Sequence, residues 1–274
     1  MGELMAGKVA LVSGSTRGIG RSIAEHLAAQ GARVVVTGRT VAKGEKVVSR
    51  IREAGGTAEF LRLDVTDEDS VRSVIEETVR RFGGLTTLVN NAAPTEVVAT
   101  TVKHLVDYTT EEWNTILTGT LTGNVFWASK YAWPHLAAAG TAGGASIVNI
   151  SSGQAIAGFK GFGAYGAAKA GVSSLTRTLA VEGAAVGIRA NTVLLGRVVS
   201  GRGDSGHHTG GGRLTRIGNP MDVAYAVAYL ACDQAAFVTG AELVADGGFS
   251  INGDAVADAE AAAKATADAA AIGS

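Results

Sequence analysis

Short runs of apolar residues alternate along the chain with longer stretches in which apolar residues recur every three to four positions. A short continuous apolar run is typical of a strand buried on both faces, and the longer period is typical of an amphipathic helix. The runs predict strands at residues 9–12, 33–37, 59–63, 87–90, 146–150, 189–193 and 242–245. The periodic stretches predict helices at residues 19–30, 41–54, 68–82, 110–138, 165–185 and 222–232.

This alternation predicts the fold class. Strands joined by helices pair in parallel through right-handed crossovers, with the helices on both faces of the sheet. We therefore predict an α/β fold with one domain, a Rossmann-like doubly wound sheet of seven mainly parallel strands. In such a sheet the ligand binds beyond the carboxyl ends of the strands, where the strand order reverses. Asp67 is a candidate helix cap, and Asn219-Pro220 is a candidate start for the last helix.

The composition changes near the carboxyl end of the sequence. Residues 1–251 carry all the predicted strands and form the predicted domain. Residues 252–274 are rich in alanine, the best helix former, and Glu260, Lys264 and Asp268 follow i, i+4 spacing. A short alanine-rich helix is marginal on its own. Two interpretations stay open: a frayed tail, and a helical tail that docks on a neighbouring subunit.

Composition and charge narrow the class of protein. The chain has 274 residues, of which 46% are apolar, so one domain can bury a large core. Its formal net charge of −1 lacks the basic excess that nucleic-acid or membrane-surface binding requires. The sequence has no apolar run of roughly 18 residues and no amino-terminal signal segment, which argues against a membrane-spanning or secreted protein. The single cysteine, Cys232, cannot form an internal disulfide, which suits the cytoplasm, and it is predicted to lie in the core.

A glycine-rich turn follows the first predicted strand and leads into the first predicted helix. Gly14, Gly18 and Gly20 are spaced Gly-x-x-x-Gly-x-Gly. Glycine lets a ligand approach the backbone closely, and the amino end of a helix attracts anions. The turn is therefore predicted to bind the pyrophosphate of a dinucleotide, with the cofactor-binding residues Gly14, Ser15, Thr16, Arg17, Gly18, Ile19 and Gly20.

Tyr165 and Lys169 form the predicted acid-base pair. They stand four residues apart in a predicted helix, so both side chains project from one face. A free phenol has a pKa near 10 and is a poor base at neutral pH. An adjacent ammonium group and the positive nicotinamide ring of an oxidised cofactor both favour the phenolate, which brings the tyrosine into useful acid-base range.

These motifs, together with Asn90-Asn91-Ala92-Ala93 and Ser152, resemble the short-chain dehydrogenase/reductase family from about residue 7 to about residue 248. The resemblance implies that Tyr165 is the general acid or base, that Lys169 also binds the nicotinamide ribose, and that Ser152 hydrogen-bonds the substrate carbonyl. It further implies that Asn90 steadies the strand ends around the cofactor. The implied cofactor site also includes Asp64, Val65, Asn91, Ala92, Val198 and Ser200.

The end of the second predicted strand decides which dinucleotide is bound. An acidic residue there would hold the ribose hydroxyls of NAD, but the sequence reads Thr37-Gly38-Arg39. Arg39 and Arg17 can bracket a ribose 2′-phosphate with planar guanidinium groups. We therefore predict NADP(H) as the cofactor, against the alternative that both arginines are solvated surface charges.

One position departs from the family pattern near the predicted catalytic pair. Thr120 stands where the family has an asparagine that holds a water molecule in a proton relay to the lysine. Thr120 is retained as a predicted catalytic residue. Asn124, one turn later, is either a substitute for that asparagine or a polar residue near a subunit contact.

Substrate specificity is assigned to the segment 197–213. This segment is rich in glycine and is predicted to be a mobile lid over the cofactor and the substrate. It contains His207 and His208, but no cluster of Cys, Asp or Glu completes a coordination shell in the sequence, so no metal site is predicted.

Together the motifs predict a cytoplasmic NADP(H)-dependent oxidoreductase that interconverts a ketone and a secondary alcohol, in short a carbonyl reductase. Two alternatives stay open: a 3-ketoacyl thioester reductase, and a non-catalytic NADP-binding protein. The resemblance also implies a small-molecule substrate and assembly as a homotetramer or homodimer.

Overall fold

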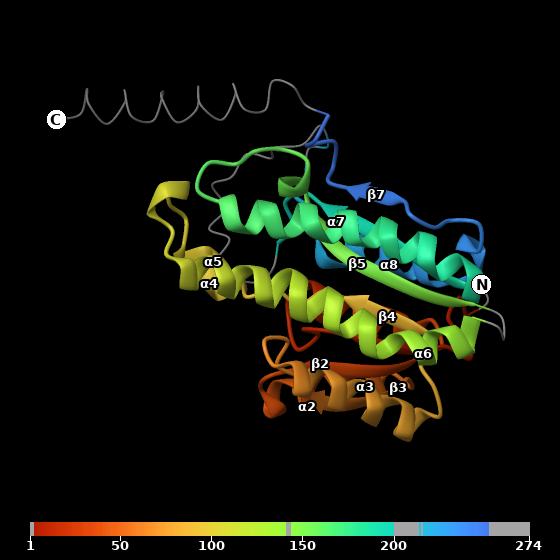
Figure 1. Cartoon of the computed structure of the whole chain (residues 1–274). Coiled ribbons are helices and arrows are strands. Elements are labelled where there is room, and N and C mark those ends of the chain that lie inside the picture. Colours follow the sequence, from red (N-terminus) through yellow and green to blue (C-terminus); the bar gives the residue numbers. More distant parts are fainter. Residues whose placement is uncertain (1–2, 141–143, 200–213, 215, 252–274) are drawn as a thin grey trace.

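The strands form one sheet, as the apolar runs predict. The structure is a computed structural model, and it describes residues 3–140, 144–199, 214 and 216–251. The strand order is β3-β2-β1-β4-β5-β6-β7, and every neighbouring pair is parallel (Figure 1). The strands are β1 (Val9–Val12), β2 (Arg33–Gly38), β3 (Thr57–Arg62), β4 (Thr87–Asn90), β5 (Ala145–Ser152), β6 (Ile188–Leu195) and β7 (Glu242–Ala245).

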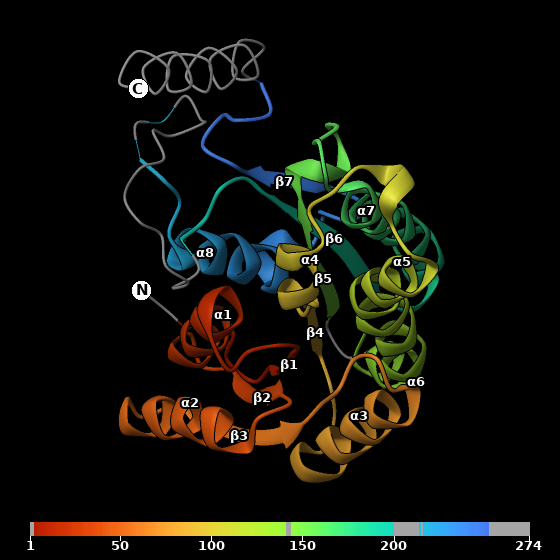
Figure 2. The same ribbon diagram turned by 90° about the vertical axis from the view of Figure 1, so that its left-hand side faces the viewer.

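Helices cover both faces of this sheet, which confirms the predicted doubly wound fold. The α-helices are α1 (Gly18–Ala29), α2 (Val41–Glu53), α3 (Glu68–Phe82), α4 (Thr95–Thr100), α5 (Thr110–Leu117), α6 (Ala128–Gly140), α7 (Gly163–Gly183) and α8 (Pro220–Ala231). Short 3-10 helices lie at Leu105–Asp107, Gly153–Ala155, Ala184–Val186 and Asp233–Ala235. Figure 2 shows α1, α2 and α8 on one side of the sheet and α3, α6 and α7 on the other.

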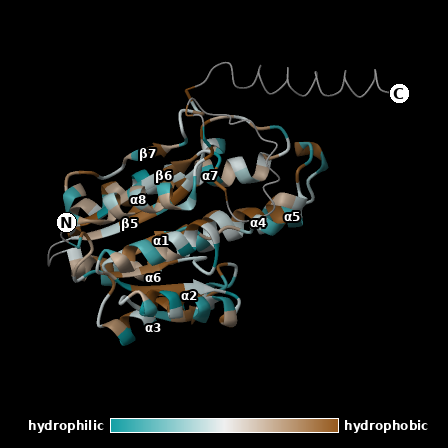
Figure 3. Ribbon diagram, turned by 180° about the vertical axis from the view of Figure 1, so that it is seen from behind, coloured by the Kyte–Doolittle hydropathy of each residue, from teal (hydrophilic) through white to brown (hydrophobic). Residues whose placement is uncertain are grey.

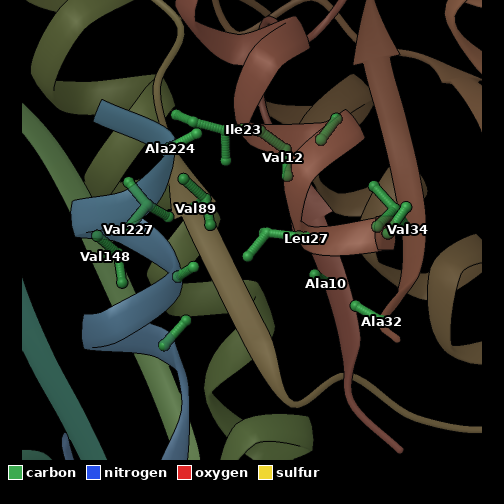
Figure 4. Close-up of a cluster of buried hydrophobic side chains, with 14 of the residues drawn as sticks. Ala10, Val12, Ile23, Leu27, Ala32, Val34, Val89, Val148, Ala224 and Val227 are labelled. Carbon is green, nitrogen blue, oxygen red and sulfur yellow. The ribbon is translucent and has the colours of Figure 1, made fainter. Parts of the chain in front are cut away.

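Each face of the sheet has its own apolar core. In β1, Ala10 and Val12 face the core under α1, α2 and α8, while Val9 and Leu11 face the core under α3, α6 and α7. Figure 4 shows Val12, Val89 and Val148 of the sheet with side chains of α1 and α8. Because both faces are buried in the centre of the sheet, strands such as β1 and β2 are mostly hydrophobic (Figure 3), which is why short apolar runs marked strands in the sequence.

The strand order places the reversal at β1. β1 has β2 on one side and β4 on the other. The segments that follow β1 and β4 therefore diverge at the carboxyl edge of the sheet and border one crevice. Two strands reach further toward this edge than their apolar runs indicated. The pairing of β5 with β6 continues to Ser152 and Leu195, so Ser152 is the last residue of its strand rather than the first residue beyond it.

The predicted helix at 110–138 is correct in position but is not one regular helix. Between α5 and α6 the chain forms a π-helix, Thr118–Trp127, whose wider turns accommodate extra residues. Gly123 lies in this segment against the loop after β3: a Cβ placed on Gly123 would stand far inside the contact distance of the Val65 carbonyl oxygen. The periodicity of apolar residues does not distinguish α from π turns, so this change could not be predicted from the sequence. The helix α4 was not predicted either, because its six residues are too few to show a period.

The predicted helix starts are confirmed. The Asp67 carboxylate accepts hydrogen bonds from the backbone N–H groups of Asp69 and Ser70 at the start of α3. Asn219 does the same for Met221 and Asp222 at the start of α8, with Pro220 in the first turn. Both caps satisfy N–H groups that a helix leaves without partners.

Some sequence predictions concern residues that the structure does not describe. The tail at 252–274 is one of them, and the domain boundary at residue 251 therefore stays a prediction. Cys232 is buried at the end of α8, as predicted for a core residue. In the described ranges, none of the helices combines the length and apolar character that crossing a bilayer would take.

The close approach of the π-helix to the loop after β3 gives a first testable expectation. Gly123→Ala would drive a methyl group into backbone rather than into a flexible side chain, so we expect the free energy of unfolding to fall by about 2–4 kcal/mol. Gly84→Ala is the matched control, because a Cβ there meets nothing within 4 Å. Urea unfolding of both variants measures the difference, and equal small losses would contradict the packing described for Gly123.

Candidate active site

The turn between β1 and α1 has the backbone geometry of an anion-binding cradle. Gly14 and Gly18 adopt φ values of 64° and 54°, a left-handed conformation that favours glycine. Helix α1 starts at Gly18 with no side-chain cap from Arg17 and no acidic residue in its first turn. The first backbone N–H groups of a helix have no partner within it, and the helix dipole adds positive potential there. The predicted pyrophosphate site therefore has the local structure that it needs.

Ser15 and Thr16 fasten this turn to the end of β2. The Ser15 hydroxyl donates to the Val12 carbonyl oxygen at 2.7 Å, and it accepts from the Thr37 N–H at 2.8 Å. Ser15 is fully buried, so its side chain supports the turn. Thr16 lies over the end of β2, where a Cβ on Gly38 would approach its Cγ2 atom to 2.6 Å.

The segment after β4 packs directly on the turn through Ser13. The Ser13 hydroxyl accepts hydrogen bonds from the N–H groups of Asn91 and Ala92 at 2.8 and 2.9 Å. The Asn91 amide in turn donates to the carbonyl oxygens of Ser13 and Gly14. A Cβ on Gly20 would stand only 2.4 Å from Asn91 Nδ2, so glycine is required there for packing. Asn91 and Ala92 are thus adjacent to the predicted pyrophosphate site.

Asn124 of the π-helix also contacts the Ser13 hydroxyl. The Ser13 hydroxyl donates to Asn124 Oδ1 at 2.6 Å, and both residues are buried. Asn124 Nδ2 and Thr120 Oγ1 have no hydrogen-bond partner among the described residues. A cavity of about 10 Å³, the size of one water molecule, is lined in part by Ser13, Asn90 and Asn124. Asn124 is thus positioned as a support for the turn, and the proton relay through Thr120 or Asn124 stays a prediction.

Asn90 starts a buried chain of hydrogen bonds across the carboxyl half of the sheet. Its amide donates to Asn149 Oδ1 at 2.8 Å, and the Asn149 amide donates to Thr176 Oγ1 at 2.8 Å. The Thr192 hydroxyl donates to the same Thr176 oxygen. The chain joins β4, β5, α7 and β6, which agrees with the role in steadying the strand ends that the family resemblance implied for Asn90.

Tyr165 and Lys169 lie together at the start of α7. Lys169 Nζ stands 5.5 Å from the centre of the Tyr165 ring and donates to the Ile150 carbonyl oxygen of β5 at 2.6 Å. Lys169 is only 2% exposed, and within the described part of the chain no carboxylate is bonded to it. Burial lowers the pKa of Lys169 to about 8 and raises the pKa of Tyr165 to about 12. The protein thus holds a lysine close to its titration range at neutral pH beside a tyrosine that keeps its proton.

Ser152 ends β5 two residues beyond the carbonyl that Lys169 binds. Its hydroxyl oxygen accepts from the Gln154 N–H at 3.3 Å in the short 3-10 helix that follows. A Cβ on Gly166, next to Tyr165, would stand 3.2 Å from the Gln154 carbonyl oxygen, so this 3-10 helix packs on the start of α7. Ser151 points the other way and donates to the Lys169 carbonyl oxygen, as expected for its opposite position in the strand.

The adenine end of the predicted site brings charged residues together. Asp64 accepts from the N–H and the hydroxyl of Thr66. Burial pushes the pKa of Asp64 upward, but the Thr66 hydrogen bonds and the charges of Arg39 and Arg62 outweigh it and hold the pKa below its ordinary value. Val65, half-buried, is fixed by its contact with Gly123. Arg17 and Arg39 approach one another, as predicted, through a shared contact with Glu96.

The predicted nicotinamide end of the site is described in part. Val198 pairs with Gly218, and two backbone hydrogen bonds, from Val199 and Gly218, hold the chain there. Beyond the ends of β6 and β7 lies a cavity of about 410 Å³ whose lining includes Val198 and Phe249. Ser200 and nearly all of the predicted lid at 197–213, with His207 and His208, lie outside the described residues. In the described ranges, the His, Cys, Asp and Glu side chains form no group of three that could hold a metal ion.

Sequence reasoning missed three residues that shape this site. Ser13 follows β1 directly, and Asn149 lies within β5. A polar residue beside or within an apolar run could have identified both as candidates. Glu96 gave no signal, because its position depends on α4, which has no recognisable period.

Comparisons with known proteins extend over most of the chain. A family model described as enoyl-(acyl carrier protein) reductase matches residues 14–250. The cis-4-hydroxycyclohexanecarboxylate dehydrogenase of Sinomonas cyclohexanicum is 41% identical over 257 residues, which are 91% of this chain and 99% of that protein. The NADP-dependent (R)-specific alcohol dehydrogenase of Lentilactobacillus kefiri is 36% identical, with coverage of 91% and 99%. The crystal structure of a dehydrogenase/reductase from Sinorhizobium meliloti 1021 matches with a TM-score of 0.80 at 34% identity, over 90% of this chain and 98% of that one.

Buried Lys169 makes stability depend on pH. Its pKa falls from an ordinary 10.5 to about 8 in the folded protein, so the unfolded chain binds more protons between these values and stability rises with pH there. Lys169→Met removes the cost of burying the ammonium group. We expect the variant to be more stable than the parent protein by about 2 kcal/mol at pH 7, with a much smaller difference at pH 9.5.

The measurement is chemical unfolding at both pH values. Lys46→Met, which removes an exposed ammonium group on α2, is the matched control. A stability difference for Lys169→Met that is the same at both pH values would show that Lys169 is not held in a desolvated environment.

Proposed function

Because this chain belongs to the short-chain dehydrogenase/reductase family, we propose that it interconverts a secondary alcohol and a ketone with NADP(H) as cofactor. The two relatives described above are named as dehydrogenases of a hydroxycyclohexanecarboxylate and of an alcohol. Both names concern hydroxy compounds, which supports this reaction class. The name of the second relative includes NADP dependence, which supports the cofactor.

The observation that carries the proposal is the burial of Lys169 beside Tyr165. Burying an ammonium group without a carboxylate partner is costly, and such sites are candidates for function. One N–H of Lys169 donates to the Ile150 carbonyl oxygen, so the other two remain for a ribose or a water molecule. A lysine with only a structural role does not need to be buried beside a tyrosine, whereas a lysine that controls the charge of a phenol must lie close to it.

The proton chemistry is assigned to Tyr165 and Ser152. The Ser152 oxygen accepts from the Gln154 N–H, which leaves its own O–H to donate to a substrate oxygen. Tyr165 donates its proton to that oxygen in reduction and removes it in oxidation. A nicotinamide cofactor, when bound beside these groups, would supply or take up the hydride. Lys169, when protonated, stabilises the phenolate that Tyr165 becomes after reduction.

The pKa of Tyr165 bears on which form of its phenol is present in the free protein. A ketone requires a protonated tyrosine, and burial raises the pKa of Tyr165 to about 12, so the proton is present in the neutral range. Oxidation requires the phenolate, which then depends on the positive charges of Lys169 and of the oxidised cofactor. We therefore propose that the free protein holds Tyr165 in the form that carbonyl reduction requires.

The cradle fits a dinucleotide with a 2′-phosphate. The left-handed glycines and the uncapped start of α1 suit the pyrophosphate. Arg17 and Arg39 both contact the carboxylate of Glu96, which supports the view that these two side chains can bind one anionic group together. The same side of the crevice offers Asp64 and Val65 for the adenosine.

An apolar wall beside Ser152 supports a hydrophobic substrate. The rings of Phe159 and Phe249 are stacked with their centres 5.8 Å apart. A Cβ on Gly153 would stand 3.9 Å from Phe249, so these rings adjoin the residue after Ser152. Ile156 of the same loop is exposed by 55%. We propose that these side chains accept the carbon skeleton of a bulky or cyclic ketone, in keeping with the ring-bearing substrate in the name of one relative.

Tyr165→Phe tests the chemical step. The loss of the phenolic proton should lower kcat for ketone reduction by at least about a hundred-fold, as expected for a missing general acid. NADPH binding, followed by the fluorescence of the cofactor, should stay within about two-fold. If turnover on a ketone panel is unaffected, Tyr165 is not the acid, and a 3-ketoacyl thioester included in the panel shows whether that substrate class is preferred.

Arg39→Asp tests the cofactor. The change removes a partner of the 2′-phosphate, places a carboxylate there, and offers the ribose hydroxyls of NAD an acceptor. We expect the ratio of kcat/KM for NADPH over NADH to fall by about ten-fold or more. Arg72→Asp, which makes the same charge change on α3, is the control. A ratio that is the same in both variants would remove Arg39 from the cofactor site.

A further inference from the structure

A carboxylate lies between the two arginines that are proposed to bind the 2′-phosphate. Arg17 Nη2 stands 3.3 Å from Glu96 Oε1, and Arg39 Nη2 stands 3.6 Å from Glu96 Oε2. Each carboxylate oxygen thus meets a different guanidinium group. Arg17 also donates to the Thr95 hydroxyl, at 3.4 Å.

The three residues meet because of the strand order. Arg17 follows β1, Arg39 follows β2, and Glu96 lies in α4 after β4, so their elements surround the crevice at the reversal of the sheet. A bridging carboxylate presents two oxygens to two guanidinium groups, as a phosphate group does. Glu96 therefore occupies the arrangement that a 2′-phosphate would need.

Both ion pairs are exposed to solvent, which makes them weak. The side chains of Arg17, Arg39 and Glu96 are 47%, 65% and 55% exposed, respectively. Exposed pairs contribute little to stability, because water screens them and long side chains lose freedom in them. A phosphate group carries up to two negative charges and three acceptor oxygens, so it can displace one carboxylate here.

We propose that Glu96 is an internal competitor for the 2′-phosphate site and thereby limits the preference of the protein for NADP(H). The proposal rests on the assignment of Arg17 and Arg39 to that phosphate. Binding of a 2′-phosphorylated cofactor breaks the ion pairs of Glu96 with Arg17 and Arg39, whereas a cofactor with a 2′-hydroxyl leaves these two pairs in place. Glu96 therefore weakens the binding of the 2′-phosphorylated cofactor and leaves the binding of the other cofactor unchanged.

The test measures binding without catalysis. Titration calorimetry on the full chain compares 2′,5′-ADP with 5′-AMP, two fragments that differ only by the 2′-phosphate. In Glu96→Gln, which keeps the size of the side chain and removes its charge, we expect 2′,5′-ADP to bind roughly three- to ten-fold more tightly. Affinity for 5′-AMP should change by less than about two-fold, so the ratio of the two dissociation constants shifts toward the phosphorylated fragment.

Two further variants make the result specific. Glu53→Gln removes the same charge from the carboxyl end of α2, at the opposite edge of the sheet from Arg39, and should leave both affinities unchanged. Glu96→Asp keeps the charge but shortens the side chain by one methylene, and should bind 2′,5′-ADP with an affinity between those of the parent protein and Glu96→Gln. The melting temperatures of Glu96→Gln and the parent protein should agree, because the broken pairs are exposed.

The outcomes separate this inference from the proposed cofactor. If the parent protein prefers 2′,5′-ADP but Glu96→Gln leaves the ratio unchanged, or weakens that fragment, Glu96 is not a competitor and the NADP(H) assignment stands. If the parent protein shows no preference and Glu96→Gln acquires one, the competitor role is supported and the cofactor proposal is wrong. If neither protein shows a preference, both are wrong.

Discussion

The Ser13 hydroxyl group is the contact on which the rest of the site depends. It donates one hydrogen bond, to Asn124, and accepts two, from the N–H groups of Asn91 and Ala92. A hydroxyl has one hydrogen and two lone pairs, so all of its capacity is used. Since Ser13 is buried at the end of β1, this one group holds together the glycine-rich turn, the segment after β4 and the π-helix. The crevice keeps its shape because these three segments cannot move independently.

The proposed nicotinamide end and the proposed adenosine end of the site use charge in opposite ways. At the nicotinamide end Lys169 is buried, where desolvation is expensive and the electrostatic effect on a neighbour is large. At the adenosine end Arg17 and Arg39 are exposed, where contacts cost little and are exchanged easily. Burial suits a group that must change the acidity of Tyr165, and exposure suits groups that must bind and release a ligand.

The sequence was sufficient for the order and type of the main elements, for the caps at Asp67 and Asn219, and for the pairing of Tyr165 with Lys169 on one helix. These features depend on local periodicity or on residues a few positions apart. The features that were missed depend on contacts between distant segments. The π-helix packs at Gly123 against Val65 of a distant segment, and the bridge at Glu96 depends on the meeting of three strand ends. No local pattern carries that information.

Because of the π-helix, α5 and α6 do not have to bury the same face of one continuous helix. Successive residues of an α-helix are about 100° apart around the axis. The wider turns of a π-helix take up extra residues, so the helix that follows can bury its apolar face although the chain is longer. In this protein α5 can therefore present its residues to α7, and α6 its own to α3, without a common helical phase. The π turns also direct Asn124 inward toward Ser13, so the geometry of this segment matters to the site as well as to the two helices that it joins.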